Sequence, residues 1–510
     1  MEHYLIAHDL GTSGNKASLF TTDGKLIRSK TVSYPTHYAP GHIAEQDPND
    51  WWKAVIQSTR DILNGIEASD VLAISFSAQM QGCVLVDKNG SILRPAIIWA
   101  DHRALAETSH LINRLGQETI YSITGHRPSA SYSLEKIMWV QQHEPDIYDQ
   151  ASYMLQAKDY IIHKLTGIFA TDASDASGTN AYDLRNHCWS KPILDAANVR
   201  HDLFPPILKS SDIAGSLTSQ AAKALGLSTH VKVVMGGGDG PCSALGAGCV
   251  QPDSLFLTFG TSAWIGGTTD EVFIDPKQRL FCFAHVIPGK YMPCGTMQSA
   301  GSAYSYIKDL FYQTECLDAK QDRQDPYDIL NNFLGQSPIG SNNLFFLPYL
   351  TGERSPYWNP KASGSYIGMA MHHTKPDYLR SVVEGIGYNL RLIFDAYKPQ
   401  LSTSNMMFTG GGAKGDQVSQ ILSEILETKL TRPAHVENAT SIAAAILAGI
   451  GIGLYEDFDI IHDFLPIQDT ICPNPSHSAF YNQRLDVFQE IYEALYPIYE
   501  KLKSLDITSR

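Results

Sequence analysis

A carboxylate and a glycine-threonine-serine turn lie close to the start of the chain, and the same tripeptide returns half a chain later. Gly11-Thr12-Ser13 comes just after Asp9, and Gly260-Thr261-Ser262 follows an apolar stretch in the second half. Glycine lets the backbone approach a ligand closely, and the N–H groups and hydroxyls of such turns can donate to phosphate oxygens. Asp9 would suit Mg²⁺, which takes one or two carboxylates and keeps several waters. The pair of turns predicts that a polyphosphate is held from two sides; the alternative is two plain hairpin turns.

A second carboxylate, Asp239, lies in the glycine-rich segment 236–240, directly after a strand predicted over residues 231–235. Turns at the carboxyl ends of strands are where α/β folds place reactive groups. Transfer of a phosphoryl group to an alcohol needs a carboxylate that orients the hydroxyl and accepts its proton. We therefore predict that Asp239 is a general base, with Gly240 beside it. The alternative is an ordinary Asp-Gly turn.

Side chains that suit a polyol follow two further apolar stretches. Met80 and Gln81 come after a strand predicted over residues 71–77, and Trp99, Asp101 and Arg103 alternate after the second stretch. Amide, carboxylate and guanidinium groups can hydrogen-bond hydroxyls, while an indole ring offers a flat apolar wall. These five residues are predicted to bind substrate. The Asp/Arg pair would serve equally well as a structural salt bridge.

Residues 409–416 form a third glycine-rich segment, between a strand predicted at residues 406–408 and a helix predicted at residues 417–426. Its spacing is neither that of a Walker loop nor that of a dinucleotide fingerprint. Bare backbone there could support a flat base or ribose, and a plain strand-to-helix turn is an equally open interpretation. Upstream, Glu353 and Arg354 stand among Pro, Tyr and Trp and are expected to form a structural ion pair in a loop between domains.

The sequence also predicts the elements that position these segments. Strands are expected at residues 4–7 and 17–21, and Asp47-Pro48 is typical of a helix start, here of an amphipathic helix at residues 51–62. A strand at residues 254–259 precedes the second Gly-Thr-Ser turn, as one precedes the first. A chain of 510 residues is too long for one core. We predict two pseudo-duplicated α/β domains, at residues 1–249 and 250–510.

Composition limits the partners. The formal charge of −14 argues against nucleic acid or an anionic membrane as the main partner. The apolar run at residues 442–454 is too short to span a bilayer and predicts a core helix. The amino terminus resembles neither a signal nor a transit peptide, so a cytoplasmic location is expected. The eight cysteines show no CxxC spacing and are expected to be buried, reduced thiols; they are Cys83, Cys188, Cys242, Cys249, Cys282, Cys294, Cys316 and Cys472.

These segments together resemble the FGGY carbohydrate kinases, which share the actin-like (ribonuclease H-like) ATPase-domain fold. Nearly the whole chain takes part, and six motifs occur in the order of the family. The resemblance implies ATP and Mg²⁺ in a deep cleft between two domains that close around sugar and nucleotide. A homodimer is plausible by the same analogy. The motifs are Asp9-Leu10-Gly11-Thr12-Ser13, Trp99-Ala100-Asp101-His102-Arg103, Gly237-Gly238-Asp239, Phe259-Gly260-Thr261-Ser262, the segment 347–356 and Gly410-Gly411-Gly412-Ala413.

The resemblance also assigns roles to single residues. Asp9 matches the aspartate of the family that serves Mg²⁺ and phosphate, and Asp239 matches its catalytic base. The residues implied at the nucleotide are Gly11, Thr12, Ser13, Gly260, Thr261, Gly301, Gly411, Gly412 and Asp416.

The acceptor is less sharply defined than the family. The motif sequences are most similar to those of xylulokinases and related pentulose kinases. These typically show Met-His where this chain has Met80-Gln81, and Asp-Asn where it has Asp239-Gly240. Asp239-Gly240 and Trp99-Ala100-Asp101 are also similar to gluconate kinases of the family. The expected acceptors are a ketopentose first, a sugar acid second and a tetritol or other polyol third.

Two other classes of protein remain open at this point. One is a chaperone-like or cytoskeletal relative of actin that hydrolyses ATP without a sugar. The other is a catalytically idle protein that binds sugar and ATP. Asp239 and the group of Trp99, Asp101 and Arg103 favour the kinase over the first, and the presence of both Asp9 and Asp239 favours it over the second.

Overall fold

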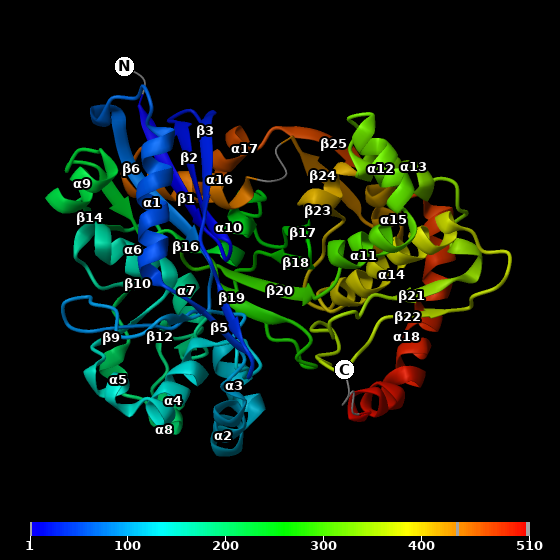
Figure 1. Ribbon diagram of the computed structural model, residues 1–510, viewed down its shortest axis with the longest axis horizontal. Coiled ribbons are helices and arrows are strands. Elements are labelled where there is room, and N and C mark those ends of the chain that lie inside the picture. The colour runs from blue at the N-terminus through cyan, green and yellow to red at the C-terminus, as the bar shows by residue number, and fades with distance from the viewer. Residues whose placement is uncertain (1–2, 435–437, 506–510) are drawn as a thin grey trace.

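The computed structural model describes residues 3–434 and 438–505. Two seven-stranded sheets form its framework, one in each half of the chain (Figure 1). The first runs in the order β14 (Ile213–Ser216), β15 (Lys232–Val234), β6 (Val71–Ala78), β1 (Tyr4–Leu10), β2 (Gly14–Thr21) and β3 (Leu26–Ser33), with β16 (Gly237–Gly238) also pairing β6. The second runs β19 (Phe281–Ala284), β20 (Tyr291–Met297), β18 (Ala263–Gly267), β17 (Leu255–Phe259), β23 (Asn405–Thr409), β24 (Lys429–Pro433) and β25 (Ile467–Ile471).

Smaller ladders and the helices surround these sheets. The ladders are β4 (His37–Ala39) with β5 (Ile43–Gln46) and β8 (Ala96–Ile97), β7 (Val84–Val86) with β9 (Tyr153–Leu155), β10 (Thr171–Asp172) with β13 (Ile207–Leu208), β11 (Tyr182–Asp183) with β12 (Cys188–Trp189), and β21 (Phe345–Leu347) with β22 (Ser365–Ile367). The helices are α1 (Pro48–Ile62), α2 (Leu105–Leu115), α3 (Gln117–Thr124), α4 (Ser133–His143), α5 (Pro145–Gln150), α6 (Ala157–Thr166), α7 (Ala173–Ser177), α8 (Lys191–Ala197), α9 (Ser219–Leu225), α10 (Asp239–Gly246), α11 (Gly301–Phe311), α12 (Gln313–Gln321), α13 (Pro326–Leu334), α14 (Lys375–Asp395), α15 (Asp416–Leu426), α16 (Ala439–Gly451), α17 (Ile461–Phe464) and α18 (Pro475–Ser504).

The two sheets share one topology. In the first, β1 and β2 form an antiparallel hairpin, β6 runs parallel to β1, β15 parallel to β6, and β14 antiparallel to β15. In the second, β17 and β18 form the hairpin, β23 runs parallel to β17, β24 parallel to β23, and β25 antiparallel to β24. Each Gly-Thr-Ser turn is therefore the tip of the corresponding hairpin. This is the arrangement expected of a duplicated α/β protein.

Local sequence explains the main elements. The β1 strand is buried along nearly its whole length, as a run of apolar residues at the centre of a covered sheet should be. Helix α1 begins where expected, because the Asp47 side chain accepts a hydrogen bond from Asn49 N–H and Pro48 occupies the first turn. Helix α14, the long core helix of the second half, begins with a capping box between Thr374 and Asp377.

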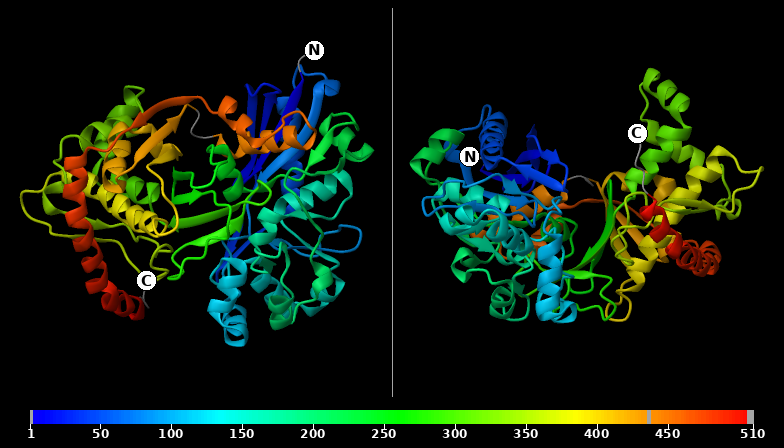
Figure 2. Two further views of the ribbon diagram at one scale, coloured as in Figure 1. Left: turned by 180° about the vertical axis from the view of Figure 1, so that it is seen from behind. Right: turned by 60° about the horizontal axis from the view of Figure 1, so that its bottom comes forward.

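One helix from each half packs against the other half. Helix α16 lies against β1 and β6 of the first sheet, where Ile442 and Ala448 share apolar clusters with Ala7, Leu5 and their neighbours. Helix α10 reaches in the opposite direction, and its Ala244 belongs to a cluster with Phe256 and Met292 of the second sheet. Figures 1 and 2 show the orange α16 beside the blue strands of the first half. The two halves are therefore held together by exchanged helices as well as by the chain.

Some expectations change in detail. The strands predicted over residues 4–7 and 17–21 are longer, so that only residues 11–13 remain as the turn. The prediction that all eight cysteines are buried is wrong for Cys188 and Cys472, which are exposed, and Cys316 is intermediate; all three lie outside the strands of the two large sheets. The eight thiols, all within the described residues, are free. None of the helices described is long and apolar enough to cross a membrane.

Candidate active site

Several hydrogen bonds fix the first Gly-Thr-Ser turn. Gly11 N–H donates to Gly14 O over 3.0 Å, which closes the hairpin. Tyr34 Oη donates to Gly11 O, and Gln46 Nε2 donates to Thr12 O over 2.7 Å. Ser13 is exposed and Thr12 is half-buried. A turn held this firmly can present its N–H groups and hydroxyls to a phosphate without rearranging.

Trp99 and Thr12 connect the predicted substrate segment to this turn. Trp99 Nε1 donates to Thr12 Oγ1 over 2.8 Å, although the two residues are far apart in sequence. The indole remains 37% exposed, so one part of the ring is free to contact a ligand. Because this hydrogen bond joins Trp99 to Thr12, a ligand on the exposed part of the ring would lie beside the first Gly-Thr-Ser turn.

Asp9 lies at the end of β1, and its carboxylate has two neighbours. Thr440 Oγ1 donates to Asp9 Oδ2 over 2.8 Å, and Lys16 Nζ is 3.6 Å from the same oxygen. No hydrogen bond is found for Asp9 Oδ1 within the described part of the chain, and the side chain is 22% exposed. No group of three or more His, Cys, Asp or Glu that could enclose a metal is found among the described residues. This donor set fits Mg²⁺ bound mainly through phosphate and water, not an all-protein cage.

Asp239 is the first residue of α10 and stands directly after the β16 glycines. Its Oδ1 accepts a hydrogen bond from Gly240 N–H over 2.8 Å. Although the residue as a whole is half-buried, burial of its carboxyl group and then the negative charge of Asp9 raise the pKa of Asp239 to about 7. A carboxyl group that changes protonation near neutral pH has the property that a general base needs.

Met80 packs against the glycines on either side of Asp239, whereas Gln81 has other contacts. A Cβ at Gly238 would lie 2.5 Å from Met80 Sδ, and a Cβ at Gly240 would lie 3.5 Å from Trp264 Cζ3 of the second half. Trp264 of the second half therefore lies next to Gly240, the residue after the proposed base. Gln81 is half-buried with φ at 63°, and its carbonyl accepts a hydrogen bond from Lys136 Nζ over 2.6 Å.

Asp101 and Arg103 form the structural salt bridge that the sequence left open. Asp101 is fully buried, and it accepts hydrogen bonds from Ala44 N–H, Arg103 N–H and the Arg103 guanidinium at 2.6 to 3.1 Å. Arg103 Nη2 also donates to Glu45 Oε1 over 2.7 Å. Burial alone would raise the pKa of Asp101, but these donors hold it below its ordinary value. The pair therefore braces β5, whose Gln46 holds the phosphate turn.

The second Gly-Thr-Ser turn brings the predicted nucleotide residues of the second half together. Gly260 N–H donates to Ser262 O over 2.9 Å, two residues on rather than three as in the first turn, and Thr261 is exposed. Gly301 N–H donates to Gly260 O over 2.9 Å, and a Cβ at Gly301 would lie only 2.3 Å from that oxygen. Glycine is therefore needed at position 301 for α11 to begin against the turn.

The third glycine-rich segment packs on the same strand end. Gly410, with φ at 85°, and Gly412 both touch Phe259, since a Cβ on either would lie within 2.5 Å of its atoms. Gly411 has open space around it and is exposed. Asp416 is also exposed and pairs with Arg432 at 2.8 Å. Gly260, Gly301 and Gly410–412 thus converge around one strand end, while Asp416 lies at the start of the next helix.

Three contacts were not foreseen from the sequence. Thr440 and Trp264 reach the first-half site from the second half, and no motif marks either of them. The expected ion pair of Glu353 and Arg354 is wrong, because no salt bridge joins them in the described chain. Glu353 is buried and accepts hydrogen bonds from Gln298 N–H and Arg354 N–H, both at 2.8 Å. These backbone donors to Glu353 Oε1, and Asn389 Nδ2, which donates to Glu353 Oε2 over 3.3 Å, satisfy this carboxylate, so the Arg354 guanidinium is left available.

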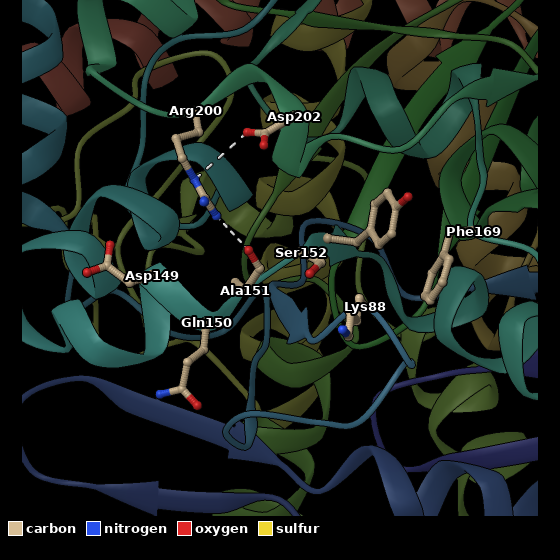
Figure 3. Close-up of a pocket in the computed structure, with 9 residues that line it drawn as sticks. Lys88, Asp149, Gln150, Ala151, Ser152, Phe169, Arg200 and Asp202 are labelled. Carbon is tan, nitrogen blue, oxygen red and sulfur yellow. Dashed lines mark hydrogen bonds and ion pairs between the residues drawn. The ribbon is translucent and has the colours of Figure 1, made fainter.

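A separate cavity of about 430 Å³ lies in the first half, away from these residues (Figure 3). Arg200 crosses it, donating to Ala151 O over 2.5 Å and pairing with Asp202 at 3.8 Å. Lys88, Tyr153 and Phe169 line the other side. It contains none of the predicted site residues, and its guanidinium is already occupied.

Comparison with known proteins decides the family. Models of the FGGY family of carbohydrate kinases match both halves, the N-terminal domain over residues 4–246 and the C-terminal domain over residues 255–452. The chain belongs to the FGGY family of carbohydrate kinases. This FGGY kinase is therefore an ATP-dependent sugar kinase, and the family membership favours that reading over the chaperone-like and idle alternatives.

Relatives of this FGGY kinase cover almost its full length. It is 33% identical over 500 residues to the xylulose kinase of Staphylococcus epidermidis, with 97% of each chain covered. Its structure is similar to the gluconate kinase from Lactobacillus acidophilus, with a TM-score of 0.92 and 29% identity over 98% of this chain and 100% of that one. The xylulose kinase from the same organism gives 0.91 and 29% over the same shares. The predicted two-domain α/β fold of the actin-like ATPase type is confirmed.

Proposed function

We propose that this kinase transfers the γ-phosphoryl group of ATP to a hydroxyl of a ketopentose such as xylulose, with Asp239 as general base. The observation that carries the proposal is Asp239, a carboxyl group of raised pKa that directly follows β16. The β16 strand pairs with β6, and β6 pairs with β1, the strand that carries Asp9. The xylulose kinases among the relatives support the choice of acceptor. The reaction is proposed to occur in the cytoplasm, and a homodimer is expected from the family resemblance.

In this mechanism the residues bind, orient and move one proton. Asp239 orients the acceptor hydroxyl and accepts its proton as the oxygen attacks the γ-phosphorus and the bond to ADP breaks. The two Gly-Thr-Ser turns donate N–H groups to the phosphate oxygens from either side, and Gly411 and Gly412 support the adenosine. Mg²⁺ held near Asp9 would supply positive charge at the phosphates. Met80, Gln81, Gly240 and the exposed part of Trp99 would line the sugar, with Asp101 and Arg103 acting as a brace.

A sugar acid such as gluconate is the second candidate, and one observation favours it. The Arg354 guanidinium has no hydrogen bond or ion pair in the part of the chain that the structure describes. Its neighbour Ser355 is bonded to Thr296, which lies opposite Trp264 on the adjacent strand. Burial first, and then the charges of Arg354 and Lys136, lower the pKa of His102, so these cations share one region. A carboxylate would be a natural partner for such a guanidinium.

The test is ADP release from Mg²⁺·ATP against a panel of acceptors: xylulose and ribulose in both hands, gluconate, glycerol and erythritol. Strong stimulation by one compound, lost in Asp239→Ala, would support the proposal and identify the acceptor. Stimulation by none of them would refute the acceptor proposed here and make a sugar-independent ATPase the next activity to test.

The pH dependence of kcat/KM for the sugar should reveal the titration of the Asp239 carboxyl group. Only its carboxylate form accepts a proton, so a pKa of about 7 predicts a plateau above pH 8 and a tenfold loss for each pH unit well below 7. Because folding raises this pKa above its ordinary 3.8, protonation of Asp239 favours the folded state, and the loss at pH 6 is not unfolding through this group. An acid limb that keeps its midpoint in Asp239→Asn would contradict the assignment.

Arg354→Ala should separate the two acceptors. If Arg354 meets a carboxylate, the KM for gluconate should rise about tenfold or more, the scale of a lost charge-assisted hydrogen bond, while the KM for xylulose changes less than about twofold. Arg354→Lys keeps the charge, so its KM for gluconate should lie between the values of the wild type and of Arg354→Ala. Equal changes for both acceptors would remove Arg354 from acceptor choice.

A further inference from the structure

A lysine and three aspartates are enclosed together behind the proposed base. Lys158 Nζ lies 2.7 Å from Asp159, 2.8 Å from Asp172 and 3.0 Å from Asp175. The four side chains are at most 1% exposed. They come from three elements in succession, α6, β10 and α7. The cluster is therefore an interior feature and not a solvated patch.

A buried ionic cluster of this kind contributes little to the stability of a fold. Taking four ionisable groups out of water costs several kcal/mol per ion, and well-packed apolar residues often do as well in the same volume. Burial alone would lower the pKa of Lys158, but the three aspartates raise it well above its ordinary value, so the lysine stays charged. Asp159 has a local task, since it closes the capping box at the start of α6. The task of Asp172 has to be sought in its other contacts.

Asp172 leads directly to the glycine turn that carries Asp239. Its Oδ1 meets Lys158, while its Oδ2 accepts hydrogen bonds from Ser174 Oγ over 2.5 Å, from Ser174 N–H over 2.9 Å and from Ser210 Oγ over 2.7 Å. Because the proton of Ser174 Oγ is donated to Asp172, the oxygen is free to accept. It accepts from Gly238 N–H over 2.9 Å, one residue before Asp239.

The turn is shaped to receive this hydroxyl. A Cβ at Gly237 would lie 2.8 Å from Ser174 Oγ and 2.4 Å from Val286 Cγ1, so that only glycine lets β16 come this close. The second half also holds this short helix, because Ala284 N–H of β19 donates to Ser177 Oγ over 3.1 Å. Ser177 Oγ in turn donates to Ser174 O over 2.6 Å. The peptide that aims Asp239 is thus tied to a fully buried ionic anchor.

We propose that Ser174 is a positioning residue for the phosphoryl transfer: it fixes the Gly238 peptide, and so the direction of the Asp239 carboxylate, while Asp172 and Lys158 hold Ser174. This rests on the proposed role of Asp239 as the base. Ser174 does not touch the substrate in this scheme. Its removal should therefore misalign the base without weakening the binding of ATP.

Ser210 supplies a matched control. Ser174→Ala and Ser210→Ala each delete one buried hydroxyl bonded to Asp172 Oδ2, but only the first breaks the bond to Gly238. We expect Ser174→Ala to lower kcat with the preferred acceptor about tenfold or more, with KM for ATP unchanged. ADP formed without sugar phosphate should rise as a share of all ADP. Ser210→Ala should stay within about twofold of the wild type on both readouts.

Asp239→Ala, measured alongside, distinguishes a failure of the positioning role of Ser174 from a failure of the proposed role of Asp239. If Asp239→Ala is inactive but the two serine variants behave alike, the positioning role is refuted and the base stands. If Asp239→Ala turns over near normally, the proposed function fails first. Should Ser174→Ala fail to fold, as judged by its melting curve, Ser174→Cys keeps the volume with a weaker acceptor. A normal kcat in Ser174→Cys would then refute the proposal.

Discussion

Asp239→Ala should lower kcat for sugar phosphorylation by at least about a hundredfold while the affinity for ATP stays near that of the wild type. The loss expected when a general base is removed is about 10²–10⁴, or at least about 2.7 kcal/mol of transition-state stabilisation. Affinity for ATP should persist because the Gly-Thr-Ser turns and the third glycine-rich segment do not use Asp239. Steady-state ADP release with the preferred acceptor, together with nucleotide binding by calorimetry, measures both quantities.

Asp239→Asn is the matched variant. The amide keeps the volume and can still accept from Gly240 N–H, but it cannot take a proton. Both variants should therefore lose a similar factor, and both should lose the acid limb of the pH profile. Turnover near the wild-type rate in either would remove Asp239 from the mechanism.

Asp9→Ala should abolish the ordinary response to Mg²⁺ and lower kcat by about a hundredfold or more. Asp9 stands two residues before the first Gly-Thr-Ser turn. An ion held mainly by phosphate depends strongly on a single protein ligand. The variant also removes the negative charge that, after burial, raises the pKa of Asp239. Any residual activity should therefore extend to lower pH than in the wild type.

Titration of the rate with Mg²⁺ at fixed ATP checks this, and binding of Mn²⁺ followed by electron spin resonance gives a readout independent of turnover. Thr440→Val is the control, because it removes one donor to Asp9 Oδ2 and leaves the charge. It should shift the titration modestly. A Mg²⁺ titration unchanged in Asp9→Ala would refute the metal role.

The turns could be predicted from the sequence because their information is local. Gly11 and Gly260 each end an apolar strand, and the residues of a hairpin tip are its neighbours in sequence. The salt bridge of Asp101 and Arg103 could be predicted as an option for the same reason, but its hydrogen bonds with Ala44 and Glu45 of another strand could not.

What could not be predicted depends on how the halves meet. Thr440 reaches Asp9 only because α16 crosses to the first sheet, and Trp264 reaches Gly240 only because the two domains face each other. Neither residue has a local signature. The expected ion pair of Glu353 was wrong for a related reason. Its donors are two backbone N–H groups, which residue types do not reveal, and the Asn389 amide of α14, which is distant in sequence.

The exchange of α10 and α16 limits how this enzyme can be recombined. A gene cut near codon 250 would separate α16 from the sheet it covers and leave Leu5 and Ala73 without their apolar cover. At the crossing a Cβ on Gly246 would lie only 1.8 Å from Ala439 O, so the two helices tolerate almost no change of shape. A chimera that joins the first half of one sugar kinase to the second half of another must therefore match two packed interfaces, that of α10 with the second half and that of α16 with the first half, and not only the linker. Relatives with different acceptors can trade loops far more readily than halves.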